Sequence, residues 1–76
     1  MLTITKKSAT QLALENLQAY IADDSVLIGD RFPTEKELCT TLGVGRGTVR
    51  EAVKVLVSQG LLEIKPGLGT FIKSKT

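Results

Sequence analysis

The sequence predicts an α+β fold that is mainly α, in which three helices are followed by a C-terminal β-hairpin. Apolar residues recur at helical spacing in three segments, two short alternating segments follow residue 60, and proline or glycine separates most segments. A length of 76 residues is enough for one small domain. The apolar share of 42% and the charged share of 24% are ordinary for a globular protein and unlike those of a disordered tail.

The first helix is predicted over residues 8–22. Ser8 and Gln11 have the spacing of a capping box, in which the serine accepts from the backbone and the glutamine side chain reaches back. An apolar face at helical spacing follows, made by Ala13, Leu14, Leu17, Tyr20 and Ile21. The run Asp23-Asp24-Ser25 ends the helix near Ala22. Residues 1–7 show no periodicity, and we expect them to form a flexible arm.

The second helix is predicted to begin after Thr34, which forms a capping box with Glu37 and follows Pro33. Gly43 provides a C-terminal cap, so the helix has only about two turns. Isolated helices need ~12–15 residues to be stable in water, so this one must pack on the rest of the domain. A turn and a brief strand near residues 31–32 are expected before it.

The third helix is predicted over residues 46–58, after a Gly43-Val44-Gly45 turn of helix-turn-helix length. One side of this helix is apolar and consists of Val49, Ala52, Val53 and Leu56. Steps of about 100° per residue place three basic residues side by side on an adjoining side, namely Arg46, Arg50 and Lys54. The helix is therefore expected to carry a basic stripe beside its apolar face.

The chain is predicted to end in a hairpin with strands at residues 61–64 and 70–73. A turn at residues 65–69 joins the strands and contains the Pro66-Gly67 pair. We expect Lys65 near the tip of this hairpin.

Charge is distributed unevenly along the chain. Residues 1–45 contain four basic and six acidic residues, a net charge of −2, whereas residues 46–76 contain six basic and two acidic residues, a net charge of +4. This asymmetry favours a polyanionic partner for the C-terminal half, although surface lysines also serve simply to solvate a protein.

Composition excludes several kinds of site. Histidine, the most frequent general acid or base near neutral pH, is absent. The single cysteine, Cys39, can form neither an internal disulfide nor, without histidine, a zinc site. We interpret it as a buried structural thiol in a reducing, cytosolic setting. The sequence has neither a secretory signal nor a run of ~20 apolar residues, so we expect a soluble protein without a membrane partner.

The glycines of the run G-V-G-R-G-T do not fit a phosphate-binding loop. The phosphate-loop motif ends in glycine, lysine and serine or threonine, and the dinucleotide fingerprint follows a strand, whereas a helix precedes these glycines. The acidic pairs Asp23–Asp24 and Glu35–Glu37 have structural explanations at helix ends. No catalytic constellation remains, so we expect no enzyme, no cofactor and no metal site.

The third helix has the properties of a DNA-recognition helix. Its N-terminal arginines, Arg46 and Arg50, are one turn apart and could each present a planar fork to guanine or to a phosphate. Thr48 could donate to a phosphate or contact a thymine methyl group. Gly45 and Gly47 lack side chains, so the start of the helix could approach the DNA backbone and offer its N–H groups.

Four further residues complete the predicted DNA-binding site. The hairpin would act as a wing, with the glycine-containing tip at Gly67 entering the adjacent minor groove and Lys65 attracted by its negative potential. Lys36, near the start of the second helix, is predicted to contact phosphate, and Lys54 extends the basic stripe.

Two alternatives remain open at this point. The basic residues could merely solvate an exposed face while the hairpin closes the core. The chain could also be a winged-helix protein-interaction module that does not bind DNA. Modules of that kind keep the core but lose the basic stripe, which this sequence has kept.

Residues 29–72 resemble the winged helix-turn-helix domain of GntR-type (gluconate-repressor-like) bacterial transcription regulators. Three pieces carry the resemblance, in the family's order and spacing: D-R-F-P-T-E-K-E-L, T-V-R-E-A and G-L-G-T-F-I. The resemblance implies a winged helix-turn-helix domain over residues 8–73. It also implies that residues 74–76 begin a linker to an effector domain absent from this chain; the alternative is a free-standing small protein.

The resemblance further implies roles for individual residues and for the whole protein. Arg46 and Arg50 match arginines that contact bases and phosphates, Thr48 and Gly47 match positions that touch the backbone, and Lys36 and Gly67 match phosphate and minor-groove contacts. Family members bind palindromic operators as homodimers in the bacterial cytoplasm, and most are repressors released by a small-molecule effector. The sequence departs from the family at Gly45 and Gly47, where serine, threonine or other larger residues are more usual, so its base preference is expected to differ.

Overall fold

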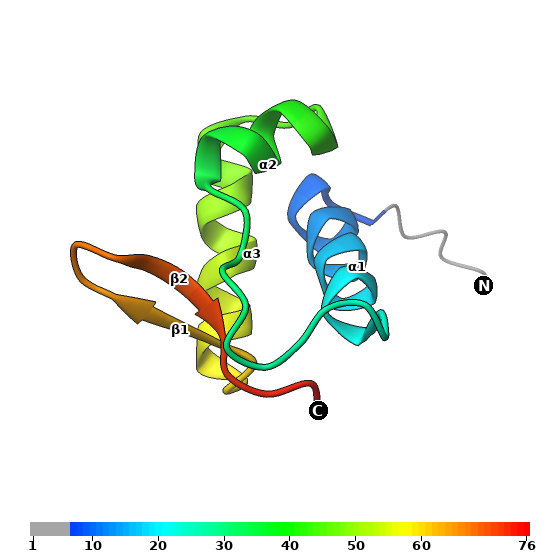
Figure 1. The fold of residues 1–76 in the computed structure, drawn as a ribbon. Coiled ribbons are helices and arrows are strands. Elements are labelled where there is room, and N and C mark those ends of the chain that lie inside the picture. The colour runs from blue at the N-terminus through cyan, green and yellow to red at the C-terminus, as the bar shows by residue number, and fades with distance from the viewer. Residues whose placement is uncertain (1–6) are drawn as a thin grey trace.

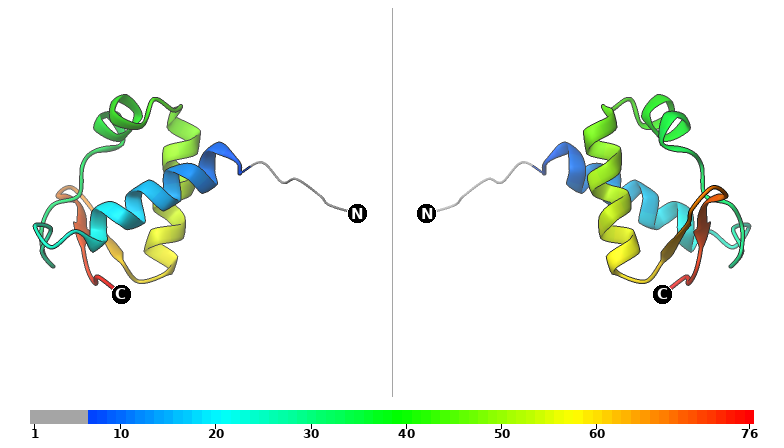
Figure 2. Two further views of the ribbon diagram at one scale, coloured as in Figure 1. Left: turned by 90° about the vertical axis from the view of Figure 1, so that its right-hand side faces the viewer. Right: turned by 90° about the vertical axis from the view of Figure 1, so that its left-hand side faces the viewer.

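The computed structural model describes residues 7–76 and contains three helices and two strands. The elements are α1 (Ala9–Ala22), α2 (Glu35–Leu42), α3 (Arg46–Ser58), β1 (Leu62–Lys65) and β2 (Gly69–Ile72). Helix α3 runs through the middle of the molecule, with α1 on one side, the β1–β2 hairpin on the other and α2 across the N-terminal end of α3 (Figure 1). The side views show α1 crossing α3 (Figure 2). This arrangement confirms the predicted fold class.

Capping at the start of α1 differs in part from the prediction. The Ser8 hydroxyl accepts a hydrogen bond from the Gln11 backbone N–H at 3.0 Å, as expected. The Gln11 side chain, however, donates to the Glu15 carboxylate at 3.2 Å instead of reaching back to Ser8. The predicted second half of this capping box is therefore wrong, because a carboxylate one turn further along the helix is a stronger acceptor for the amide.

Helix α2 has both of its predicted caps. The Thr34 hydroxyl accepts from the Glu37 N–H at 3.1 Å, while the Glu37 carboxylate accepts from the Thr34 N–H at 2.9 Å. Gly43 ends the helix in the left-handed conformation, with φ of +67°, which glycine adopts without steric cost. Gly45 then provides the N-cap of α3 in an extended conformation, without a side-chain hydrogen bond.

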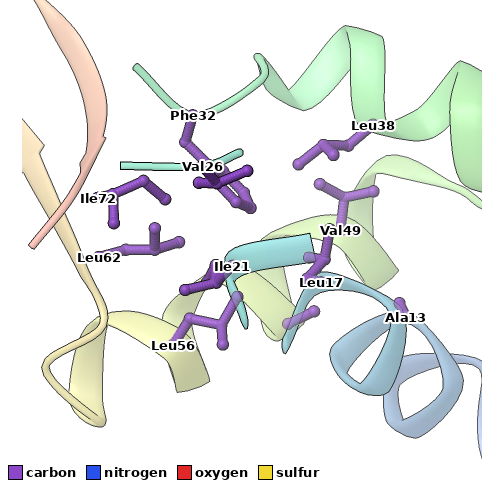
Figure 3. Close-up of a cluster of buried hydrophobic side chains, with 11 residues drawn as sticks. Ala13, Leu17, Ile21, Val26, Phe32, Leu38, Val49, Leu56, Leu62 and Ile72 are labelled. Atoms are coloured by element: carbon purple, nitrogen blue, oxygen red, sulfur yellow. The ribbon is translucent and has the colours of Figure 1, made fainter. Parts of the chain in front are cut away.

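The hydrophobic core takes residues from every element and from the loop before α2 (Figure 3). Its buried members are Ala13, Leu17, Ile21, Val26, Phe32, Leu38, Val49, Ala52, Leu56, Leu62 and Ile72. Helix α2 contributes Leu38, which agrees with the expectation that so short a helix must pack on the domain. Cys39 packs against this cluster but is only half-buried, not buried as predicted, because it lies about 100° round α2 from the buried Leu38.

The hairpin strands lie one residue away from their predicted positions. Lys65 pairs with Gly69 and belongs to β1, whereas the sequence analysis placed it in the turn. The turn is tighter than expected, since the Leu68 N–H donates to the Lys65 carbonyl at 2.9 Å. Pro66 and Gly67, with φ of +76° at the glycine, fill the two central positions as a type II turn requires.

The brief strand predicted near residues 31–32 is present as a single antiparallel bridge between Arg31 and Phe71. The Phe32 N–H also donates to the Thr70 carbonyl at 2.8 Å. The loop before α2 is therefore fixed to β2, which lies between this loop and β1, and this sets the position of the wing relative to α2 and α3.

Both predicted terminal segments can be placed only in part. Residues 1–6 of the predicted arm lie outside the described residues, and Lys7 pairs with Glu15 of α1 at 2.8 Å. In the predicted linker, the Lys75 ammonium donates to the Asp23 carbonyl at 2.6 Å and also to the Val26 carbonyl. Lys75 is thus held against the loop that follows α1. The role of residues 74–76 as a linker stays a prediction.

Across residues 7–76, none of the helices combines the length and apolar character that crossing a bilayer requires.

Candidate nucleic-acid interface

The N-terminal half of α3 presents two arginines to solvent. Val49 and Ala52 are completely buried, so packing fixes the rotation of the helix about its axis. In this orientation the side chains of Arg46 and Arg50 are 70% and 64% exposed. The predicted separation of an apolar face from a basic stripe is therefore present in the folded protein.

A carboxylate from α2 joins the two arginines. The Nε of Arg46 lies 3.2 Å from Oε1 of Glu35, and the Nε of Arg50 donates to Oε2 of Glu35 at 2.9 Å. Glu35 was predicted only to favour the positive end of its own helix, and this contact with α3 was not predicted. No local sequence signal reveals it, because the contact depends on how α2 packs across α3.

These ion pairs do not occupy the guanidinium groups fully. A guanidinium has five N–H donors, so one interaction through Nε leaves the four N–H donors of the Nη groups for a partner. Exposed ion pairs also stabilise a protein by only about 0.2–1 kcal/mol each, so they can be exchanged for contacts with a charged ligand. Glu35 thus orients Arg46 and Arg50 and leaves the group of three residues with a net charge of +1.

The glycines at the start of α3 have no steric explanation within the described protein. Neither Gly45 nor Gly47 has a positive φ, and a Cβ atom added at either position would meet nothing within 4 Å. Both residues are exposed, and neighbouring Thr48 is half-buried. The backbone at the start of α3 is consequently open to close approach by a partner.

A groove separates α3 from the wing. It has a volume of about 670 Å³ and includes Gly47, Arg50 and Lys54 of α3 in its lining, with Glu35 at its edge toward α2. The opposite side is formed by Ile64, Gly69 and Thr70 of the wing. Lys54 is exposed, so the basic stripe continues from the start of α3 into this groove.

The remaining predicted residues lie outside this groove. Lys36 is exposed and follows Glu35, which places it about 100° further round α2. The Lys65 ammonium lies 5.0 Å from the centre of the Phe71 ring, a cation–π distance that holds it on one face of the hairpin. Gly67 is exposed at the tip. The site therefore consists of a central cluster on α2 and α3 and a separate wing tip.

In the part of the chain that the structure describes, no three cysteine, aspartate or glutamate residues gather as metal ligands would.

Comparison with known proteins gives one consistent family. The model of the bacterial regulatory proteins of the gntR family matches residues 9–72. The chain is 46% identical over 65 residues to the HTH-type transcriptional regulator Rv0792c of Mycobacterium tuberculosis, covering 86% of this chain and 24% of that relative. It is 41% identical over 61 residues to the mannosyl-D-glycerate transport/metabolism system repressor MngR of Escherichia coli, covering 80% of this chain and 25% of that repressor. The chain thus spans about a quarter of the length of these two relatives.

Solved structures agree with this result. The DNA-binding domain of AraR in complex with operator ORR3 is similar with a TM-score of 0.84 and 35% identity, over 95% of this chain and 87% of that one. GntR of Streptococcus agalactiae is similar with a TM-score of 0.77 and 38% identity, over 87% of this chain and 32% of that one. The fold is therefore that of a winged helix-turn-helix domain, and the chain belongs to the gntR family of bacterial regulatory proteins.

Proposed function

We propose that this domain binds double-stranded DNA sequence-specifically, as the DNA-binding part of a transcription regulator. The observation that carries the proposal is the exposed pair Arg46 and Arg50 at the start of α3, held by Glu35 and flanked by a wing. The similarity to the AraR domain, whose structure was solved with operator DNA, supports it.

In this proposal the start of α3 enters the major groove. An arginine fork pairs with the O6 and N7 atoms of guanine, and each good contact of this kind discriminates against a wrong base by about 1–3 kcal/mol. Arg46 and Arg50 are placed to make such contacts. Thr48 and the backbone at Gly45 and Gly47 contact the sugar–phosphate chain.

The other predicted residues bind the backbone and the neighbouring minor groove. Lys36 and Lys54 contact phosphates on either side of the recognition helix. The wing tip at Gly67 enters the minor groove, and Lys65 approaches the same groove from β1. These assignments follow from exposure, charge and position in the fold.

The whole regulator is proposed to be a metabolite-responsive repressor in the bacterial cytoplasm. It would bind a palindromic operator as a homodimer and take its small-molecule effector in a second domain. Support comes from the relatives, which are about four times as long as the matched segment and include a protein named as a repressor. If a second domain joins two copies of the regulator, the isolated domain should bind a half-site and a palindrome with equal affinity per domain. The full regulator should bind the palindrome more tightly than the half-site.

Titration of the domain with duplex DNA tests the proposal. A duplex enriched from a random library should bind more tightly than a scrambled duplex by a factor of roughly a thousand or more. Binding should weaken steeply with salt, because each phosphate contact releases condensed counterions. Equal, weak binding to both duplexes would contradict sequence-specific recognition, and no binding at low salt would favour a protein-interaction module instead.

A further inference from the structure

The groove between α3 and the wing lies where a DNA strand has to pass. In B-DNA the major groove and the adjacent minor groove are separated by one sugar–phosphate backbone. If α3 occupies the major groove and the wing tip the minor groove, the backbone between them crosses the space between these two elements. This step rests on the proposed function.

Most of the groove lining is apolar, and the charged side chains within it carry a small positive excess that favours an anion. Its basic residues are Arg31, Arg50 and Lys54, and its acidic residues are Glu35 and Glu51, so the formal charge is +1. The carboxylate of Glu35 is already shared by the recognition arginines, Arg46 and Arg50. Among these groove residues, Arg31 comes from none of the three helices and was not part of the predicted DNA-binding site.

Arg31 lies against the wing. A Cβ atom added at Gly69 would lie 3.1 Å from the Nε of Arg31, which is closer than Cβ atoms normally approach. The Arg31 side chain can therefore keep this position undisturbed only beside a glycine. The backbone bridge between Arg31 and Phe71 fixes the residue to the same strand. Arg31 is exposed, and none of the ion pairs within residues 7–76 includes it. Its charge also lowers the pKa of Glu37 slightly, after the larger effect of the Thr34 hydrogen bonds.

We propose that the protein groove between α3 and the wing holds the DNA backbone that separates the major from the minor groove, and that Arg31 binds one of the phosphates of this backbone. The guanidinium presents several N–H donors on a flexible stem, and Gly69 gives it room to lie between the wing and α3. Arg31 thus adds a phosphate contact that positions the wing and reads no base.

The test compares R31Q, R31K and K73A with the wild-type domain, using the enriched and scrambled duplexes over a range of salt concentrations. R31Q keeps a long polar side chain beside Gly69 while removing the charge. We expect it to lower the affinity for both duplexes by roughly tenfold and to reduce the slope of log affinity against log salt by about one. R31K should keep the slope. Lys73, an exposed residue after β2, serves as a matched loss of one charge, and K73A should keep the wild-type slope.

A second measurement changes the DNA and compares the wild-type domain with R31Q. Phosphates of the enriched duplex are replaced singly by uncharged methylphosphonates, and we expect one position between the two base grooves where replacement weakens wild-type binding but not binding by R31Q. A normal slope for R31Q, whether or not affinity falls, would overturn the proposal, since a purely structural role leaves the number of released ions unchanged. Wild-type protein that binds neither duplex would instead contradict the proposed function itself.

Discussion

The two recognition arginines share the single carboxylate of Glu35, although the three residues belong to two helices. Long arginine side chains lose about 2 kcal/mol of rotamer entropy when they are fixed. Part of that loss is incurred before DNA arrives, because the Nε of each arginine is already oriented by Glu35. Such preorganisation lowers the entropic cost of binding and favours one geometry of the guanidinium forks.

Glu35→Ala is therefore expected to reduce discrimination more than affinity. The variant removes a negative charge, which strengthens attraction to any duplex, but it also frees both arginines. We expect the ratio of affinities for the enriched and scrambled duplexes to fall about three- to tenfold, as measured by fluorescence anisotropy at constant salt.

Glu51 provides the matched control for that experiment. It lies on α3, lines the same groove and takes part in none of the ion pairs of residues 7–76. Glu51→Ala removes the same charge without freeing an arginine. The ratio of its affinities for the enriched and scrambled duplexes should therefore stay close to that of the wild type. Equal ratios for the two variants would show that Glu35 acts through charge alone.

At the scale of the elements, α2 depends on its caps. It has eight residues, too few for a stable isolated helix, and is held by the reciprocal bonds between Thr34 and Glu37, by Gly43 and by Leu38. Because α2 also carries Glu35, fraying of its first turn would disturb the orientation of the recognition arginines. The capping box therefore connects the stability of a short helix to the geometry of the binding face.

The same capping box makes stability depend on pH. The backbone N–H of Thr34 donates to the Glu37 carboxylate at 2.9 Å, and this bond, followed by the effect of the nearby Thr34 side chain, holds the pKa of Glu37 below its usual value of 4.5. A lowered pKa in the folded state means that the stabilisation is fully present above the usual value and is lost as pH falls through the folded-state pKa. The free energy of unfolding, from urea denaturation, should thus decrease as pH is lowered below about 4.5.

Glu37→Gln isolates this contribution. Glutamine keeps the length and the acceptor of a capping box but does not titrate. The variant should be less stable than the wild type at neutral pH and should lose less stability on acidification. Glu15 and Asp23, whose pKa values are lowered by Lys7 and by Ser25, will keep part of the dependence. Parallel curves for the variant and the wild type between neutral and acidic pH would contradict the assignment to Glu37.

At the scale of the whole molecule, the surfaces for packing and for binding are separate. The core lies where α1, α3 and the base of the hairpin meet (Figure 3), and the wing tip extends away from it (Figure 1). The recognition arginines are exposed on α3. Helix α3 serves both surfaces, with Val49, Ala52 and Leu56 on one side and Arg46 and Arg50 on another. Substitutions on the binding side should consequently leave the fold intact.

Features with local signals could be predicted from the sequence. The Thr34–Glu37 capping box, the Gly43 cap and the apolar face of α3 involve residues at most a few positions apart, and the structure confirms them. Two other predictions from the local sequence were wrong in detail. Glu15 attracts the Gln11 side chain away from Ser8, and the tight turn at Pro66 moves Lys65 into β1.

Contacts between distant segments could not be predicted in the same way. The pairs from Glu35 to Arg46 and Arg50, and the position of Arg31 beside Gly69, require the relative placement of α2, α3 and the wing. The sequence predicted which residues carry charge on the binding face. It did not predict that a carboxylate orients two of them, or that Arg31 joins them.

The most direct test of the account is the duplex affinity of the variant in which Arg46 and Arg50 are both alanine, measured beside its circular dichroism spectrum and melting temperature. Because both side chains are exposed and lie off the packing face, the fold should persist. We expect the double variant to lose its discrimination between the enriched and scrambled duplexes, since each lost base contact costs about 1–3 kcal/mol. A folded double variant that binds the enriched duplex with wild-type affinity would contradict the central claim that α3 reads DNA.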